Sequence, residues 1–512
     1  MLHNHCHATR GAGLLRRLLL FVLSCTCLAA GALTPEEEER IARINLPLVE
    51  ITTVSGADPN CTFVAPPPGC MGNGITNNFY LSGRIRISEG GKVVYDSGEY
   101  RDGVSGIRIK VRGNSSAYPP KKPYRVKLTH KADLLQRGDD AYEDKEWLLL
   151  GNYQDTHTLQ TVVGLKVGRL VGMEWEPEWR YVHVVLNGKY RGCYLLCEPV
   201  ERGERRCDIE ESGYLVENDA YWWNTDETVF HSERLTPAMG YTFKYPAEED
   251  LTAERVDNIR NYINAFEERL YEDGDIAEYI DLASFAGWTL GQDILGTFDG
   301  CGSNMFLYKK DYVPAHPTST KLKLGPLWDF DSNYRTQDEW SAQHGIDHFY
   351  VKKLFERPDF LSVYADKWEE IKGTLHEEVM NEIKALRETD GEAIVACREL
   401  EEELFGLYQA VSWESTEQAV DEWFTARIAW LDAAIGQLST GIDGQPADGA
   451  APLSVSVFDA TGRLRLSART GVRAGSDEAE RLLREAGAAS GLYIVREQLP
   501  DGTARSRKLL LR

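Results

Sequence analysis

Residues 106–128, GIRIKVRGNSSAYPPKKPYRVKL, are the stretch from which the fold of the first half can be inferred. Polar and apolar residues alternate over 106–112 and 122–128, which predicts two β-strands, because successive strand side chains point to opposite faces. The loop from Gly113 to Ser116 joins these strands. Short strands joined by Gly-rich loops indicate a β-rich region here.

The same stretch suggests an anion site. A Gly/Ser loop that leaves a strand exposes backbone N–H groups to an anion. Alternation places Lys121, Arg125 and Lys127 on one strand face, opposite Tyr124. Three cations on one face suit a phosphate. The pattern also fits a solvated edge strand whose lysines discourage pairing with another chain.

The pattern changes along the chain from strand to helix. Further strands are expected at 45–54, 79–87, 92–96, 147–150, 181–186 and 190–197, the last two joined by the hairpin signal Asn187-Gly188. Helical spacing appears at 156–171, 252–272, 276–297 and over most of 359–437, with short strands at 305–309 and 321–324. The fold class is therefore α+β, with a β-rich part followed by a helical part.

Composition limits the possible functions. The 512 residues are 42% hydrophobic, which is enough for a large core and excludes wholesale disorder. The 57 basic against 80 acidic residues give a net charge of −23. This acidic excess argues against nucleic-acid binding, which usually needs a basic patch. No run of about 20 apolar residues follows the first 35, so we expect no internal transmembrane span.

The two ends of the chain differ from its middle. Residues 1–32 combine arginines, an apolar run and the small residues Ala30-Gly31-Ala32, which predicts a signal peptide; a short membrane anchor is the alternative. The main domain is then 33–437. Residues 438–452 are Pro/Gly-rich and predict a linker. Residues 453–512 contain four short alternating runs and predict a small β-sandwich.

An exported chain passes through an oxidising compartment, so its cysteines can pair. Cys61 and Cys70 flank a Pro-rich loop and are the best disulfide candidates. Cys193 and Cys197 share one strand face, but no His or Cys quartet completes a zinc site around them.

Two further clusters carry oxygen ligands. Asp299 and Asn304 lie on a Gly-rich loop between a helix and a strand, where an Asp base and an Asn amide suit phosphoryl transfer. The alternative is an Asx-turn loop, in which the Asp and Asn side chains only hydrogen-bond to their own backbone. Asp329 and Asp331 follow an apolar strand and are flanked by aromatic residues, so they can hold Mg²⁺, although an exposed turn is the alternative.

In these residues the sequence resembles the spore-coat protein H (CotH) kinase-like family. The matching blocks, in the expected order, are RGNSSAYPPKKPYRVKL at 112–128, LLLGNYQDTHTLQ at 148–160, VLNGKYRGCYLLCEPV at 185–200, GYLVEND at 213–219, FDGCGSNMFLY at 298–308 and GPLWDFD at 325–331. The resemblance implies an atypical protein-kinase-like fold of two lobes, a β-rich N-lobe and a helical C-lobe. It also implies transfer of phosphate from ATP to Ser/Thr of secreted or coat proteins.

The resemblance further implies roles for single residues. Asp299 would be the catalytic aspartate, and Asn304, Asp329 and Asp331 would bind Mg²⁺ or Mn²⁺. The phosphates of ATP would contact the loop and the basic strand, with no firm choice among the cations. The residues implied in phosphate binding are Arg112, Ser115, Lys122, Arg125 and Lys127, and the choice left open is among the last three. Glu198 ends a hairpin and would lie near the adenine.

The tail resembles the C-terminal sorting domain of type IX secretion, on VSVFDATGRL, GLYIVR and RKLLLR; an ordinary accessory sandwich is the alternative. With the signal peptide, this implies contact with the secretion machinery and a secreted or outer-surface location. Two functions compete: a secreted kinase acting on Ser/Thr of exported proteins, and a catalytically inactive kinase-like surface or envelope protein. A glycan-processing surface enzyme is a weaker third possibility.

Overall fold

A computed structural model describes residues 33–70, 72–75, 79–234, 238–297, 300, 303–335, 337–341, 349–406, 411–443, 454–459, 464–468, 484, 491–498 and 504–511. The chain divides into two compact units, Met1–Gly436 and Gln437–Arg512, and each is described by itself. The predicted signal peptide, residues 1–32, lies outside the described residues.

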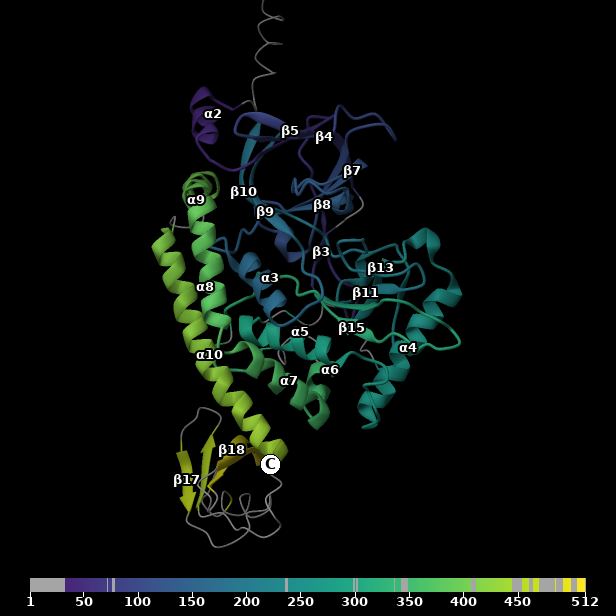
Figure 1. Cartoon of the computed structure of the whole chain (residues 1–512), viewed down its shortest axis with the longest axis vertical. Helices are drawn as coiled ribbons and strands as arrows, with labels where there is room; N and C mark the ends of the chain where they lie inside the picture. The colour runs from purple at the N-terminus through teal and green to yellow at the C-terminus, as the bar shows by residue number, and fades with distance from the viewer. Residues whose placement is uncertain are drawn as a thin grey trace, which may run out of the picture. The chain divides into compact units, whose positions relative to one another are not determined.

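The first half of the chain forms a large sheet that closes on itself (Figure 1). Its order is β1-β9-β10-β8-β7-β6-β4-β5, and β1 pairs with β4 as well as with β9. The strands are β1 (Leu48–Thr53), β4 (Leu81–Glu89), β5 (Lys92–Asp96), β6 (Ile107–Val111), β7 (Tyr124–Ala132), β8 (Asp144–Leu150), β9 (Trp179–Leu186) and β10 (Lys189–Cys197). The predicted β-rich first half is confirmed, whereas its closure is a feature that the sequence pattern did not indicate.

Alternation along these strands builds the core inside the closed sheet. Ile107, Ile109 and Val111 of β6 are buried, and so are Tyr124 and Val126 of β7, which pairs with β6. The predicted hairpin turn at Asn187-Gly188 is present, and a second tight turn lies at Gly90-Gly91. Asn187-Gly188 and Gly90-Gly91 have positive φ at both central residues, which suits two-residue hairpins.

A second sheet follows, in the order β12-β13-β11-β14-β15. Its strands are β11 (Tyr214–Asp219), β12 (Val229–Phe230), β13 (Gly240–Tyr245), β14 (Met305–Lys309) and β15 (Leu322–Leu324). Helices α4 (Ala253–Tyr271) and α5 (Leu282–Leu295) lie between β13 and β14 in the chain. A separate two-stranded ribbon joins β2 (Phe63–Val64) to β3 (Gly74–Ile75).

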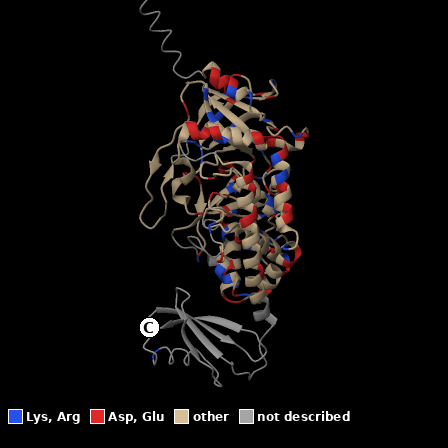
Figure 2. Cartoon of the chain, turned by 90° about the vertical axis from the view of Figure 1, so that its left-hand side faces the viewer, with Lys and Arg blue, Asp and Glu red and all other residues tan. Residues whose placement is uncertain are grey.

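The remaining helices pack beside these sheets, and α8, α9 and α10 run along one side of the first unit (Figure 1). They are α2 (Pro35–Ala42), α3 (Gln160–Leu170), α6 (Phe349–Leu354), α7 (Pro358–Ile371), α8 (Leu375–Leu386), α9 (Glu392–Phe405) and α10 (Trp413–Asp443), with one π-helical turn at Arg387–Gly391. Short 3-10 turns occur at Ser115–Ala117, Asp140–Tyr142, Trp222–Asn224 and Glu248–Asp250. The predicted helical second half is confirmed, and Figure 2 shows acidic and basic residues interspersed over these helices.

Two predicted helices begin later than expected. The helix expected at 276–297 begins at Leu282, because the Asp281 carboxylate accepts the backbone N–H of Ser284 at 2.9 Å. The helix expected at 156–171 begins at Gln160, whose backbone N–H donates to Asp155 at 2.6 Å. Short polar side chains of this kind compete with the helix and fix its first turn.

The second unit contains one antiparallel sheet, β17-β16-β18-β19. Its strands are β16 (Ser454–Asp459), β17 (Leu464–Ala468), β18 (Gly491–Gln498) and β19 (Ala504–Leu511), which correspond to the four predicted runs. The β-sandwich itself stays a prediction. Helix α10 continues to Asp443, through the first residues of the segment expected as a linker.

Two sequence expectations concern cysteines and membranes. Cys61 and Cys70 are free thiols, so the predicted disulfide between them is wrong for this structure; the β2–β3 ribbon, rather than a cross-link, holds this loop. In the part of the chain that the structure describes, no helix is both long and apolar enough to cross a membrane.

Candidate functional site

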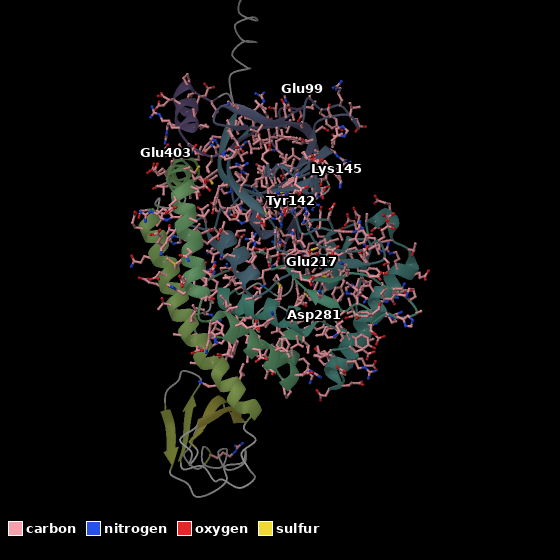
Figure 3. All side chains as sticks on the ribbon, in the orientation of Figure 1. Glu99, Tyr142, Lys145, Glu217, Asp281 and Glu403 are labelled. Carbon is pink, nitrogen blue, oxygen red and sulfur yellow. The ribbon has the colours of Figure 1, made fainter. Side chains whose placement is uncertain are left out.

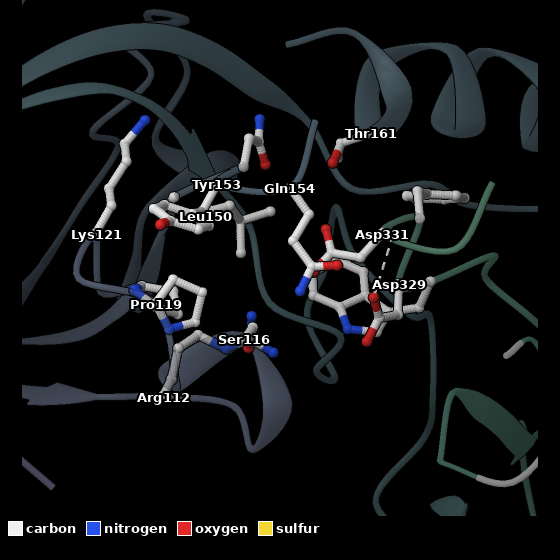
Figure 4. Close-up of a pocket in the computed structure, with 15 residues that line it drawn as sticks. Arg112, Ser116, Pro119, Lys121, Leu150, Tyr153, Gln154, Thr161, Asp329 and Asp331 are labelled. Carbon is white, nitrogen blue, oxygen red and sulfur yellow. Dashed lines mark hydrogen bonds between the residues drawn. The ribbon is translucent and has the colours of Figure 1, made fainter. Parts of the chain in front are cut away.

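A pocket forms where the loop after β6 faces the segment after β15 (Figure 4). It encloses about 620 Å³ of space, part of it open to solvent. Three parts of the chain line it: the β6–β7 loop, the loop after β8 with α3, and the acidic segment. The lining residues are Arg112, Ser116, Pro119, Lys121, Pro123, Leu150, Gly151, Asn152, Tyr153, Gln154, Thr161, Trp328, Asp329, Phe330 and Asp331.

Arg112 supplies a cation to this pocket. It directly follows β6, and its guanidinium carbon lies 5.8 Å from the centre of the Trp328 ring. The side chain is half-buried. Burial lowers the pKa of the Arg112 guanidinium, and Asp329 and then Asp331 oppose that shift. An arginine stays charged even so, and a half-buried guanidinium facing a pocket can bind an oxyanion.

The loop beside Arg112 is shaped by Gly113. Its φ of +77° is a conformation that favours glycine, and a Cβ at this position would collide with the Ser116 hydroxyl. The turn that follows places Ser116 in the pocket lining and leaves Ser115 exposed. The hydroxyl that lines the pocket is therefore that of Ser116 and not that of the predicted Ser115, because the 3-10 turn points the two side chains in different directions.

The acidic segment is anchored from behind by close packing. Phe330 is buried and packs against Gly164 of α3, and Leu327 packs against Gly291 of α5. The backbone N–H of Leu327 donates to the buried Glu176 carboxyl at 3.0 Å. These contacts hold the backbone on both sides of Asp329.

Asp329 and Asp331 turn toward the pocket from this anchored segment (Figure 4). Asp329 has φ of +62°, and its carboxylate accepts the backbone N–H of Asp331 at 3.5 Å. Burial raises the pKa of Asp329, and the nearby Arg112 guanidinium opposes that shift. A half-buried carboxylate with a raised pKa gains from a cation that neutralises it.

The pocket fits a divalent cation only in part. Asp329 and Asp331 supply carboxylate oxygens, which Mg²⁺ prefers, and Mg²⁺ commonly keeps several water and phosphate ligands. Asn304 is buried immediately before β14. Within the described residues, no three His, Cys, Asp or Glu side chains cluster as a metal site. Asp299, the predicted catalytic aspartate, lies outside the described residues.

Lys121 lines the pocket, but its ammonium group is committed elsewhere. The side chain is 2% exposed, and Nζ lies 2.6 Å from Glu401 Oε1 on α9 and 5.0 Å from the centre of the Tyr194 ring. Sequence reasoning placed Lys121 on the strand face with Arg125. Because β7 begins at Tyr124, Lys121 belongs to the preceding loop, and no sequence signal pointed to its partner on α9.

The other basic candidates lie outside the pocket lining. Lys122 donates to the carbonyl of Ala117 at 2.5 Å, so it fastens the 3-10 turn. Arg125 and Lys127 point from the outer face of β7 to Glu146 on β8, at 2.9 and 2.8 Å. Of the three cations that the strand pattern placed on one face, Arg125 and Lys127 share the Glu146 carboxylate, whereas Lys121 pairs with Glu401.

Glu198 lies outside the lining of the Arg112 pocket, and its predicted place near the adenine stays a prediction. It is 1% exposed and accepts Arg137 at 2.9 Å and the backbone N–H of Glu178 at 3.0 Å. It borders a second hollow, with Arg206 and Tyr142, instead of the pocket that contains Arg112. Glu198 therefore fixes the segment after β10 through hydrogen bonds.

Glu217 of β11 lies close enough to Arg112 to feel its charge (labelled in Figure 3). It pairs with Lys244 at 2.8 Å. Burial is the main cause that raises the pKa of Glu217 to about 7, with Lys244 opposing and Asp219 adding to the shift. The second sheet thus contributes a charged group near the pocket that the sequence patterns did not single out.

Comparison with known families gives one match. The model of the family described as CotH kinase protein matches residues 109–431, which is more than half of the chain, and the chain therefore belongs to this family. The matched region contains the Arg112 loop, the acidic segment and α9. A comparison with curated proteins found no match.

Proposed function

We propose that this member of the CotH kinase family transfers phosphate from ATP, in the presence of Mg²⁺ or Mn²⁺, to Ser or Thr of exported proteins. The family supports a kinase-related function in general. The observation that carries the specific proposal is the pocket in which Arg112 faces Asp329 and Asp331. Phosphoryl transfer needs this combination, because its catalysis is mostly positioning and charge neutralisation.

Arg112 would hold a phosphate oxygen through its N–H groups, and its contact with the Trp328 ring would limit the directions that the guanidinium can take. Ser116 and the backbone N–H groups of the Gly113 loop add neutral donors beside it. Lys121 would act indirectly, by fixing the loop against α9.

Asp329 and Asp331 would hold the divalent cation, with Asn304 as the family-implied amide ligand. The cation would neutralise charge on the phosphate oxygens when bound. The raised pKa of Asp329 fits this role, because a bound cation offsets the cost of burying a carboxylate. Asp299 would accept the proton of the Ser or Thr hydroxyl, a role that rests on the resemblance.

The location of this chemistry belongs to the proposal as well. A signal peptide at 1–32 and a type IX sorting domain at 453–512 would take the protein to the outer surface, through contact with the secretion machinery. Its substrates would then be other exported proteins that present Ser or Thr.

Radiolabel transfer from γ-labelled ATP tests the proposal directly. The chain is incubated with Mg²⁺ or Mn²⁺, and autophosphorylation is followed in parent, Asp329→Asn and Arg108→Ala proteins. Arg108 is exposed on β6, the strand that precedes Arg112, and serves as the matched control. We expect labelling in the parent and control and loss in Asp329→Asn. A folded parent that neither labels nor gains thermal stability from nucleotide would instead support the inactive binding protein.

A further inference from the structure

Two buried cysteines meet where α9 packs against β10. Cys193 of β10 is 2% exposed, and Cys397 of α9 is 0% exposed. The neighbouring Cys397 thiol, together with burial, raises the pKa of the Cys193 thiol. The hydroxyl of Tyr190, on the same strand, lies 3.5 Å from Cys397 Sγ.

The next turn of α9 contacts the same strand. Glu401, four residues after Cys397, accepts the backbone N–H of Cys193 at 2.6 Å. Residues four apart lie on one face of a helix, so Cys397 and Glu401 face β10 together. Gly192 makes room for this contact: its φ is +96°, it lies at a β-bulge, and a Cβ there would collide with the Glu401 carboxylate.

A third contact holds the end of α9. Arg40 of α2 forms two parallel hydrogen bonds with Glu403, each of 2.8 Å, and Figure 3 labels Glu403 at this end of the helix. The register of α9 on the sheet is therefore set at several points along the helix. A fixed register is what a cross-link between Cys193 and Cys397 requires, because disulfide geometry tolerates little displacement.

The other described cysteines have different surroundings. The Cys197 thiol donates to the carbonyl of Glu198 at 3.3 Å. Cys207 is buried near Glu176 and Arg206, and Cys61 and Cys70 are half-buried free thiols. All six cysteines that the structure describes are free thiols in it. Cys193 and Cys397 differ from the other four because both side chains are buried where α9 packs against β10.

We propose that Cys193 and Cys397 are an oxidation site and form a disulfide when the chain folds under oxidising conditions. With a small-molecule disulfide as oxidant, one thiolate attacks it and releases the first small thiol. The second cysteine thiolate then attacks this mixed disulfide and releases another small thiol. The two cysteines lose two electrons and two protons in total, and the oxidant is reduced to two thiols.

Burial determines when this reaction is possible. A thiolate is the reactive species, and a buried thiol with a raised pKa forms little of it. The cross-link would therefore form before α9 is fully packed, during folding. The same burial would then shield the finished disulfide from reductants, so it would be a lasting structural bond.

The cross-link would act on the pocket through Glu401. Tying α9 to β10 fixes Glu401, whose carboxylate holds the Lys121 ammonium at 2.6 Å, and Lys121 belongs to the pocket wall. The disulfide would thus be connected to the pocket through Cys397, then Glu401 on the same helix, and then Lys121. The bond itself does not depend on phosphotransfer, so its presence is tested separately from the proposed function.

Peptide mapping of the full chain tests the proposal. The protein is folded with oxidised glutathione or with a reductant, alkylated during denaturation and digested without reduction. We expect a peptide linking Cys193 to Cys397 in the oxidised sample alone. Alkylation of both cysteines in the oxidised sample, or a linkage of either one to another cysteine, would overturn the proposal.

Thermal unfolding adds a second measurement. The oxidised parent should unfold on the order of 5 °C above the reduced parent, because the cross-link closes a long loop. The difference in unfolding temperature between oxidised and reduced protein should disappear in Cys397→Ser. It should remain in Cys207→Ser, because this variant changes a buried thiol at another place in the protein. A difference that persists in Cys397→Ser contradicts the assignment. If Cys397→Ser does not fold, the peptide map of the parent decides.

Discussion

The Arg112 guanidinium lies over the Trp328 ring, with 5.8 Å between its central carbon and the ring centre. Arg112 directly follows a strand of the first sheet, and Trp328 follows the last strand of the second. The contact therefore joins the two sheets at the edge of the pocket. Asp329 comes next in the chain, and both Arg112 and Asp329 line the pocket.

Replacing Arg112 with Met should keep the packing on Trp328 and remove the charge. We expect phosphotransfer to fall about 10- to 100-fold, which corresponds to the loss of one charge-assisted contact in the transition state. Labelling rates at saturating ATP measure this loss. Arg108→Met, on the exposed face of the same strand, should leave the rate within about twofold of the parent. Equal losses in both variants would show that Arg112 has no special role.

Asp329→Asn should separate activity from stability. Burial raises the pKa of this carboxyl, so the folded state binds its proton more tightly than the unfolded chain does. The free energy of unfolding therefore falls as pH rises from the ordinary aspartate pKa of 3.8 to the raised pKa of the folded state. Asparagine stays neutral, so the variant does not lose this stability. We expect the Asp329→Asn variant to unfold at the parent temperature or above it at pH 7, while Mg²⁺-dependent labelling disappears. A strongly lowered unfolding temperature with retained labelling would contradict this role.

Gly164→Ala should disturb the pocket without touching it directly. A Cβ at position 164 would collide with the ring of Phe330, which lies between the two acids. We expect a loss of about 1–3 kcal/mol in the free energy of unfolding and weaker nucleotide-induced stabilisation. Gly436→Ala is the matched control, since nothing beyond the adjacent backbone of its own helix lies within 4 Å of its Cβ position. That substitution should be neutral or stabilise α10 by about 0.5–1 kcal/mol.

His183 should make stability sensitive to acid. It is 2% exposed, and burial lowers its pKa from 6.5 to about 4. Between those values the unfolded chain binds a proton that the folded chain does not, so stability falls as pH drops from 6.5 to 4. The loss is about 3 kcal/mol at full effect. Urea unfolding at about pH 7 and about pH 4.5 should show a smaller difference in His183→Phe than in the parent; equal differences would contradict the assignment.

Local patterns in the sequence determined much of the secondary structure. Asn187-Gly188 predicted its hairpin because both residues tolerate positive φ, which a two-residue turn requires. The helix expected at 252–272 is found at Ala253–Tyr271, since its apolar spacing and its Thr252 cap agree. Strand 305–309 has the predicted bounds. In each case, the physical cause of the secondary structure lies in residues that are close together in the sequence.

The acidic segment could be singled out for a related reason. Two aspartates directly after an apolar strand, each beside an aromatic residue, are costly to bury without a cation, and the structure does place them at a pocket. Arg112 was among the candidates because a Gly/Ser loop follows its strand. On the basic strand, the sequence left the choice among Lys122, Arg125 and Lys127 open.

Only the tertiary structure shows which partner each cation has, because those partners are distant in the chain. Lys121 forms an ion pair with Glu401, and Arg125 forms one with Glu146, whereas Arg112 faces Asp329. Closure of the first sheet through the β1–β4 pairing has the same origin. Periodicity fixes which face of a strand is buried, but charge pairing and sheet closure are set by long-range contacts, which no local pattern encodes.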